Sequence, residues 1–255
     1  MVLCEHGAFG CAADWAVVQE RLAVQGLRSL AYDRAGLGHS EPGPVPRDGG
    51  AIMQDLRRLL DALDETVPVV LVGHSMGGLM VRLFALTYPE RVVGLVLVDA
   101  ITPDILDIPG ARKAIRAFAG LLQVASVAGR LGLMVPVSQI SANMIGLTGE
   151  PAREKRRIHA SARHAHWAAN EVLSWPVTSA LASASELTTD LPIAVVTAGA
   201  FQAANPVKQA QIGPATHARY GRIEHVAGST HANLLGPRFA DAIVRGVQHV
   251  LGAER

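Results

Sequence analysis

The sequence predicts an α/β fold: a mostly parallel central sheet with helices on both faces and an inserted helical segment. Short β-branched runs alternate with helical patterns along the chain, which is typical of strands joined by helices. Between Asp99 and Leu191, about ninety residues carry helical patterning without a clear strand, a length too great for an ordinary loop. The chain has 255 residues, of which 49% are hydrophobic and 18% charged, so it can bury a full core.

The strands are predicted where short apolar runs end in turn-forming residues. These runs are residues 1–5, 27–33, 67–72, 92–100, 191–199 and 222–228. Apolar residues at helical spacing predict helices over residues 14–26, 48–65 and 238–252, and another from Ser75 to just before Pro89. We therefore expect a core built from residues 1–100 and 190–255, with residues 101–189 inserted as a helical cap.

Composition excludes several classes of protein. The formal net charge of +1 gives no electrostatic reason to expect nucleic-acid binding. The two cysteines, Cys4 and Cys11, do not suggest a disulfide framework, and no signal peptide is visible, so a cytoplasmic location is expected. Residues 117–137 approach the length of a membrane span, but a span would bury Arg130, so one or two amphipathic helices are predicted instead.

The stretch "VPVVLVGHSMGGLM" (67–80) combines a buried run with an abrupt turn of small residues. It contains G-x-S-x-G between a predicted strand and a predicted helix, the context in which a serine can serve as a nucleophile. Gly73 and Gly77 would let the strand and the helix approach closely, and the amides that begin the helix would face an anion beside Ser75. Ser75 is therefore the predicted nucleophile.

In these features the chain resembles the α/β-hydrolase superfamily, and three further stretches support the resemblance. "HGAFG" (6–10) is similar to its oxyanion loop, and "DRAGLGHS" (33–40) to its D-x-x-G-x-G-x-S turn. "GSTHANL" (229–235) is similar to the loop that bears the catalytic histidine. The family usually has two strands before the one that leads to the His-Gly loop, and the sequence begins at about that third strand. Either those edge strands are dispensable or the native chain is longer. Loss of these strands would expose a sheet edge, which would favour aggregation or association into homo-oligomers.

The resemblance implies a division of roles. Ser75 would attack an acyl carbon, while His231 would accept its proton and return it to the leaving group. The backbone amides of Ala8 and Met76 would form the oxyanion hole. Among the ten histidines, only His231 follows the last core strand in a glycine-rich loop. The cluster of His159, His164 and His166 lacks the partners of a zinc site, so neither a metal nor another cofactor is expected.

The acid of the triad departs from the family pattern. The usual position follows the strand after the cap, yet no Asp or Glu occurs from Leu191 through Ile223, and Gln202 stands about where the carboxylate belongs. Some branches of the superfamily take their acid from the end of the strand after the nucleophile, where this chain has Asp99. Asp99 is therefore the predicted acid, with Asp104 as the reserve and a chain without an acid as the third alternative.

A serine at the nucleophile position argues against the alkyl-enzyme chemistry of dehalogenases and epoxide hydrolases, which needs a carboxylate. Few charged residues occur between 117 and 149, which predicts an apolar pocket, whereas the "EPAREKRR" run (150–157) is interpreted as a solvated helix start. We expect a carboxylesterase for small hydrophobic esters or lactones. The alternatives are a C–C bond hydrolase, a haloperoxidase-like enzyme, and a degenerate protein that only binds small molecules.

Overall fold

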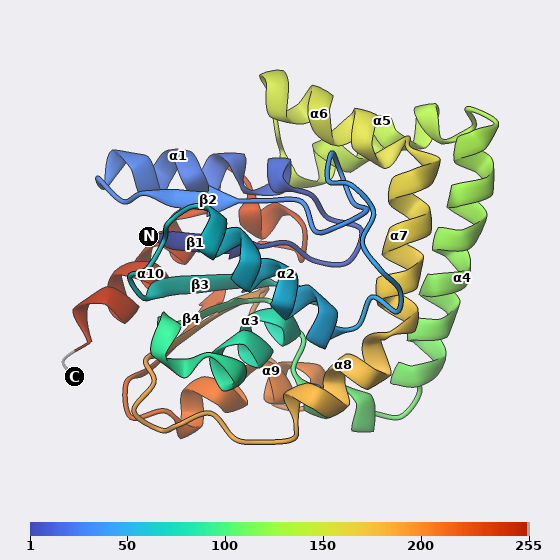
Figure 1. Cartoon of the computed structure of the whole chain (residues 1–255). Helices are drawn as coiled ribbons and strands as arrows, with labels where there is room; N and C mark the ends of the chain where they lie inside the picture. The colour runs from blue at the N-terminus through green and yellow to red at the C-terminus, as the bar shows by residue number, and fades with distance from the viewer. Residues whose placement is uncertain (254–255) are drawn as a thin grey trace.

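A computed structural model describes residues 1–253, and its centre is a six-stranded sheet in the order β2-β1-β3-β4-β5-β6 (Figure 1). Every neighbouring pair of strands is parallel. The strands are β1 (Val2–Glu5), β2 (Ser29–Ala31), β3 (Val69–His74), β4 (Val92–Val98), β5 (Ile193–Ala198) and β6 (Gly221–Val226). The predicted α/β class with a parallel sheet is confirmed. β2 forms one edge, and association through a sheet edge remains a prediction.

Helices cover both faces of this sheet because successive strand residues point to opposite sides. Leu71 belongs to the apolar cluster on the side of α2 and α3, whereas its neighbours Val70 and Val72 belong to the cluster on the side of α1 and α10. The helices of these two layers are α1 (Ala16–Val24) and α10 (Asp241–Gly252) on one face, with α2 (Gly49–Ala62), α3 (Gly77–Thr87) and α9 (Pro206–His217) on the other.

All the regular secondary structure described between β4 and β5 is helical. It contains η3 (Pro103–Asp107), α4 (Ala111–Arg130), α5 (Met134–Ile145), α6 (Gly149–His159), α7 (Ala162–Leu173) and α8 (Trp175–Ala182). Helices α4 to α7 lie beyond the carboxyl ends of the strands, with α4 packed along α7 (Figure 1). We call residues 101–189 the cap segment; its standing as a separate domain remains a prediction. In the described part of the chain, no helix combines the length and apolar character that a membrane crossing needs.

Buried ion pairs connect the cap segment to the sheet. The Arg34 guanidinium, 1% exposed, donates to Glu171 of α7 with Nη2–Oε2 at 2.7 Å and also pairs with Glu5 of β1. It donates as well to the backbone carbonyls of His6 and Gly7, at 2.7 and 3.1 Å. The same guanidinium therefore holds one cap helix against the loop that follows β1.

One helix was absent from the sequence-based expectations. Residues 198–214 correspond to the loop that the resemblance predicts after the strand, but Pro206–His217 form α9, which packs on β5 and β6. The hydrophobic periodicity of the sequence does not predict α9, because its apolar residues do not gather on one face and Pro214 lies inside it. Its start did carry a signal, because the Asn205 side chain accepts from the amides of Val207 and Lys208 and Pro206 occupies the first turn.

Candidate active site

Ser75 occupies a sharp turn between β3 and α3. Its φ of +53° lies in the left-handed region, where non-glycine residues are strained. A Cβ on Gly73 would come within 2.7 Å of the Gly77 carbonyl oxygen, and a Cβ on Gly77 within 2.4 Å of the Glu5 carbonyl oxygen. The two glycines therefore allow the close approach that the sequence pattern predicted, and the turn places Ser75 at the carboxyl end of the central strand.

Asp99 and His231 come together at the neighbouring strand ends. Asp99 directly follows β4, and His231 lies in the loop between β6 and the short helix η4 (Asn233–Leu235). His231 Nδ1 donates to Asp99 Oδ2 at 2.7 Å, which leaves Nε2 for proton exchange. Asp104, in η3, is exposed and forms no hydrogen bond with His231 among the described residues.

The second oxygen of Asp99 has partners that the sequence did not reveal. Lys208 Nζ, from α9, donates to Asp99 Oδ1 at 2.8 Å, and the Ala198 amide donates to the same oxygen at 3.1 Å. Burial alone raises the pKa of the Asp99 carboxyl, but the hydrogen bonds from His231 and Lys208 outweigh it and hold the pKa well below its usual range. The Asp99 carboxyl is therefore ionised at neutral pH.

His74 supports the loop that carries His231. Its Nε2 donates to the His231 backbone carbonyl at 2.9 Å, and the two rings lie 4.5 Å apart between centroids. Burial, with a smaller effect from His231, lowers the pKa of His74 to about 3. A ring that stays neutral keeps this donor in place without adding a second charge beside His231.

The two amides expected to form the oxyanion hole have no protein acceptor. Neither the Ala8 nor the Met76 N–H donates a hydrogen bond to any described residue. Met76 precedes the first turn of α3, where helix amides have no partner within the helix. Ala8 lies in the loop after β1 and borders the same pocket as Ser75. Both amides are thus free to bind an oxygen that carries developing negative charge.

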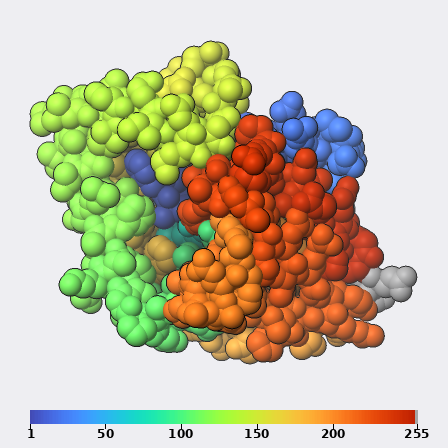
Figure 2. All heavy atoms as spheres, turned by 180° about the vertical axis from the view of Figure 1, so that it is seen from behind, coloured from blue at the N-terminus to red at the C-terminus, as the bar shows by residue number. Residues whose placement is uncertain are grey.

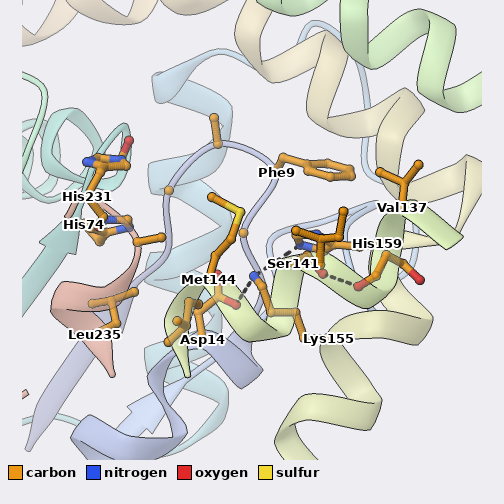
Figure 3. A pocket seen from close by; sticks show the side chains of 18 of the residues that line it. Phe9, Asp14, His74, Val137, Ser141, Met144, Lys155, His159, His231 and Leu235 are labelled. Carbon is orange, nitrogen blue, oxygen red and sulfur yellow. Dashed lines mark hydrogen bonds and ion pairs between the residues drawn. The ribbon is translucent and has the colours of Figure 1, made fainter. Parts of the chain in front are cut away.

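A pocket of about 360 Å³ joins these groups to the cap segment. Ser75, His231 and Ala8 line it, and its remaining walls are mostly apolar, from Phe9, Phe118, Met134, Val137, Ile140, Met144, Ile145 and Leu235. Figure 3 shows His74 and His231 at one end, with Val137 and His159 at the other. Seen from behind in Figure 2, the molecule is hollowed between α4–α5 and the C-terminal segments, with atoms of the first residues at the floor.

One charged cluster interrupts this apolar lining. Lys155 of α6 forms an ion pair with Asp14, which lies in the 3-10 helix η1 (Ala12–Trp15), and its Nζ is 3.3 Å from His159 Nε2. The expectation that residues 150–157 are a solvated helix start is wrong for Lys155, whose side chain is 6% exposed. Among the described residues, no group of three or more His, Cys, Asp or Glu side chains is arranged to hold a metal ion.

Known proteins resemble this chain in fold and in part of its sequence. Residues 1–123 match the family model of the alpha/beta hydrolase fold. An sn-1-specific diacylglycerol lipase of Mus musculus is 40% identical over 95 residues, which are 37% of this chain and 30% of that protein. The first curated relatives are matched over only 32–41% of their own length.

Solved structures match over nearly the whole chain. An esterase from Thermogutta terrifontis has a TM-score of 0.69 at 22% identity, with 98% of this chain and 89% of that chain covered. The epoxide hydrolase CorEH has a TM-score of 0.68 at 19% identity, covering 98% and 90%. At these identities the likeness shows the fold alone. With the family-model match over residues 1–123 and the parallel sheet, this likeness shows that the chain has the alpha/beta hydrolase fold.

Proposed function

We propose that this protein is a serine hydrolase that cleaves carboxylic esters or lactones of hydrophobic substrates. The observation that carries the proposal is the hydrogen bond from His231 Nδ1 to Asp99 Oδ2, because His231 borders the pocket that also contains Ser75. A histidine held by an ionised carboxylate beside a serine is the arrangement that activates a serine hydroxyl. The hydrogen bond between His231 and Asp99 also weakens the alternative of a degenerate protein that only binds small molecules, because binding alone does not require a histidine paired with a carboxylate.

In the proposed mechanism, Ser75 Oγ attacks the carbonyl carbon while His231 Nε2 takes its proton. The oxyanion of the tetrahedral intermediate accepts hydrogen bonds from the amides of Ala8 and Met76. His231 then protonates the leaving alcohol, and the acyl group stays on Ser75. Water, deprotonated by His231, attacks this acyl-enzyme and releases the acid. Throughout, Asp99 fixes the ring orientation and stabilises the imidazolium that forms at each proton transfer.

The apolar pocket supports a hydrophobic acyl or alcohol group, and the cap segment forms its roof. Ser75 in the turn argues against the alkyl-ester intermediate of epoxide hydrolases, since that chemistry needs a carboxylate nucleophile. We also propose a cytoplasmic location, which the free buried thiols of Cys4 and Cys11 support.

A panel of p-nitrophenyl esters of increasing acyl length tests the proposal. We expect turnover that Ser75→Ala abolishes, together with covalent labelling of the wild type by a fluorophosphonate. Asp99→Asn should lower kcat on the order of 10⁴-fold, as loss of the orienting charge does in Ser-His-Asp enzymes. The matched control Asp104→Asn removes a nearby exposed carboxylate and should leave kcat within about twofold. Absence of both turnover and labelling would contradict the proposal, whereas labelling without ester turnover would favour C–C bond cleavage.

A further inference from the structure

Helices α4 and α5 expose an apolar surface that nothing in the described chain covers. Nine of the nineteen large hydrophobic side chains exposed in the described residues fall between positions 121 and 144, each 52–70% exposed. They are Leu121, Val124, Val127, Leu131, Leu133, Val135, Val137, Ile140 and Met144. We call them the α4–α5 surface. Monomeric proteins rarely expose so concentrated an apolar patch, and such patches mark sites of protein or membrane contact.

The pattern in α4 shows that this exposure is built into the helix. Ile115, Ala119 and Leu122 are buried on one side, where α4 packs along α7. Leu121 and Val124 lie on the opposite side, and Leu131, the residue directly after α4, continues it, because spacings of three and seven residues correspond to one face of a helix. Figure 1 shows α4 as the outermost helix, beyond α7 from the sheet. The helix therefore has two apolar faces, of which the fold uses one.

Charge distinguishes between the partners that could cover this surface. Between Asp107 and Glu150 the chain has four cationic side chains and no Asp or Glu; the cations are Arg112, Lys113, Arg116 and Arg130. All four are exposed, and none forms an ion pair with a described residue. A second copy of this chain, packed through the same surface about a two-fold axis, would bring two such cationic sets together without an acid to balance them.

We propose that the α4–α5 surface binds membranes that contain anionic lipids, with α4 and α5 lying in the headgroup region. Exposed valine, leucine and isoleucine side chains would enter the acyl boundary, while the flanking arginines and lysine would contact anionic headgroups. The surface reaches the pocket, because Val137, Ile140 and Met144 are both exposed and part of the pocket lining. Figure 3 shows Val137 and Met144 beside the cavity. An apolar molecule could thus pass from the bilayer to the cavity without crossing water.

This inference does not rest on the proposed hydrolase activity, since binding can be measured without a substrate. The test is flotation of the full chain with vesicles of phosphatidylcholine alone, or with about 30 mol% phosphatidylglycerol to supply negative surface charge. We expect binding to the anionic vesicles, little binding to the neutral ones, and weaker binding at high salt, which screens the cations. The variant Ser75→Ala should bind like the wild type, so failure of either proposal leaves the other testable.

Two sets of variants assign the binding to this surface. The triple variant Leu121→Gln, Val124→Gln, Leu131→Gln changes only exposed side chains outside the pocket and should lower the partition coefficient at least tenfold. Replacing two of the cations, Arg116→Gln with Arg130→Gln, should lower it about fivefold for each charge removed.

The control replaces two exposed valines outside the cap segment, Val24→Gln with Val45→Gln, and should bind like the wild type. Near-ultraviolet circular dichroism verifies that each variant is folded. Equal binding by all variants, or no preference for anionic vesicles, would overturn the proposal. So would a wild-type dimer that the triple variant converts to monomer, because that result would assign the surface to self-association.

Discussion

Acid should weaken the contact between the cap segment and the loop after β1, because that contact contains buried neutral histidines. His164 Nδ1 accepts from the Gly38 amide at 3.1 Å, and Nε2 donates to the Phe9 carbonyl at 3.3 Å. The His159 ring lies 4.3 Å from the Phe9 ring between centroids. Burial lowers the pKa of His164 to about 4, although the Phe9 carbonyl partly opposes it, and burial lowers that of His159 well below its usual value.

The magnitude follows from the pKa difference between the folded and unfolded chain. An unfolded histidine titrates near about 6.5, whereas folded His164 titrates at about 4. Between these values only the unfolded chain binds the proton, so the free energy of unfolding falls as the pH falls, by up to about 1.4 kcal/mol per pH unit. For His164 this amounts to roughly 2 kcal/mol between about pH 8 and about pH 5, a large share of an ordinary stability.

Urea unfolding of wild type and His164→Gln across this pH range measures the effect. Glutamine keeps one donor and one acceptor but does not titrate, so the loss of stability on acidification should shrink by about 2 kcal/mol. The readout is the pH dependence, which a general loss of packing would not alter. His217→Gln, at an exposed position of α9, is the matched control and should follow the wild type. An unchanged pH dependence in His164→Gln would refute the reasoning.

Two further predictions concern charged side chains near the site. Arg34→Leu should lower the free energy of unfolding near neutral pH by about 3–5 kcal/mol in a urea titration, because it leaves Glu5 and Glu171 buried without their cation; a loss below about 1 kcal/mol would contradict this. Lys208→Met should keep kcat within about tenfold of wild type, since the bond between His231 and Asp99 remains, but should move the acid limb of the pH–activity profile upward. That shift follows because Lys208 helps to hold the pKa of Asp99 low, and an unmoved acid limb would count against it.

Local patterns sufficed for the fold and for the placement of most candidate site residues. The run of residues 67–80 contains its own strand, turn and helix start, so Ser75 could be placed without knowledge of distant contacts. The order of the strands then brings β4 beside β3, and Asp99 emerges at the same sheet edge as Ser75. His231 follows the last strand, as expected. The catalytic roles of these residues remain predictions.

The partners that the sequence concealed are charges that meet across the fold. Lys155 lies in a charged run for which the sequence predicts a solvated helix start. Its partner Asp14 is 141 residues away in the sequence, and the ion pair between them compensates the cost of burying both side chains. Lys208 is 109 residues from Asp99 and belongs to the helix that periodicity did not reveal. No local pattern encodes such a pair, because burial of a lysine depends on the carboxylate that compensates it.

The position of the acid explains why Lys208 belongs to the site. Asp99 lies at the end of a central strand, where its carboxylate is removed from water, and burial alone would favour the protonated form. A protonated Asp99 could not stabilise an imidazolium at His231. The chain from Ile193 through Ile223 contains no Asp or Glu; instead it provides the Ala198 amide at the end of β5 and the Lys208 ammonium in the first turn of α9, both directed at Asp99 Oδ1. These donors leave Oδ2 for His231, so a segment without an acid still determines whether the acid on the neighbouring strand is charged.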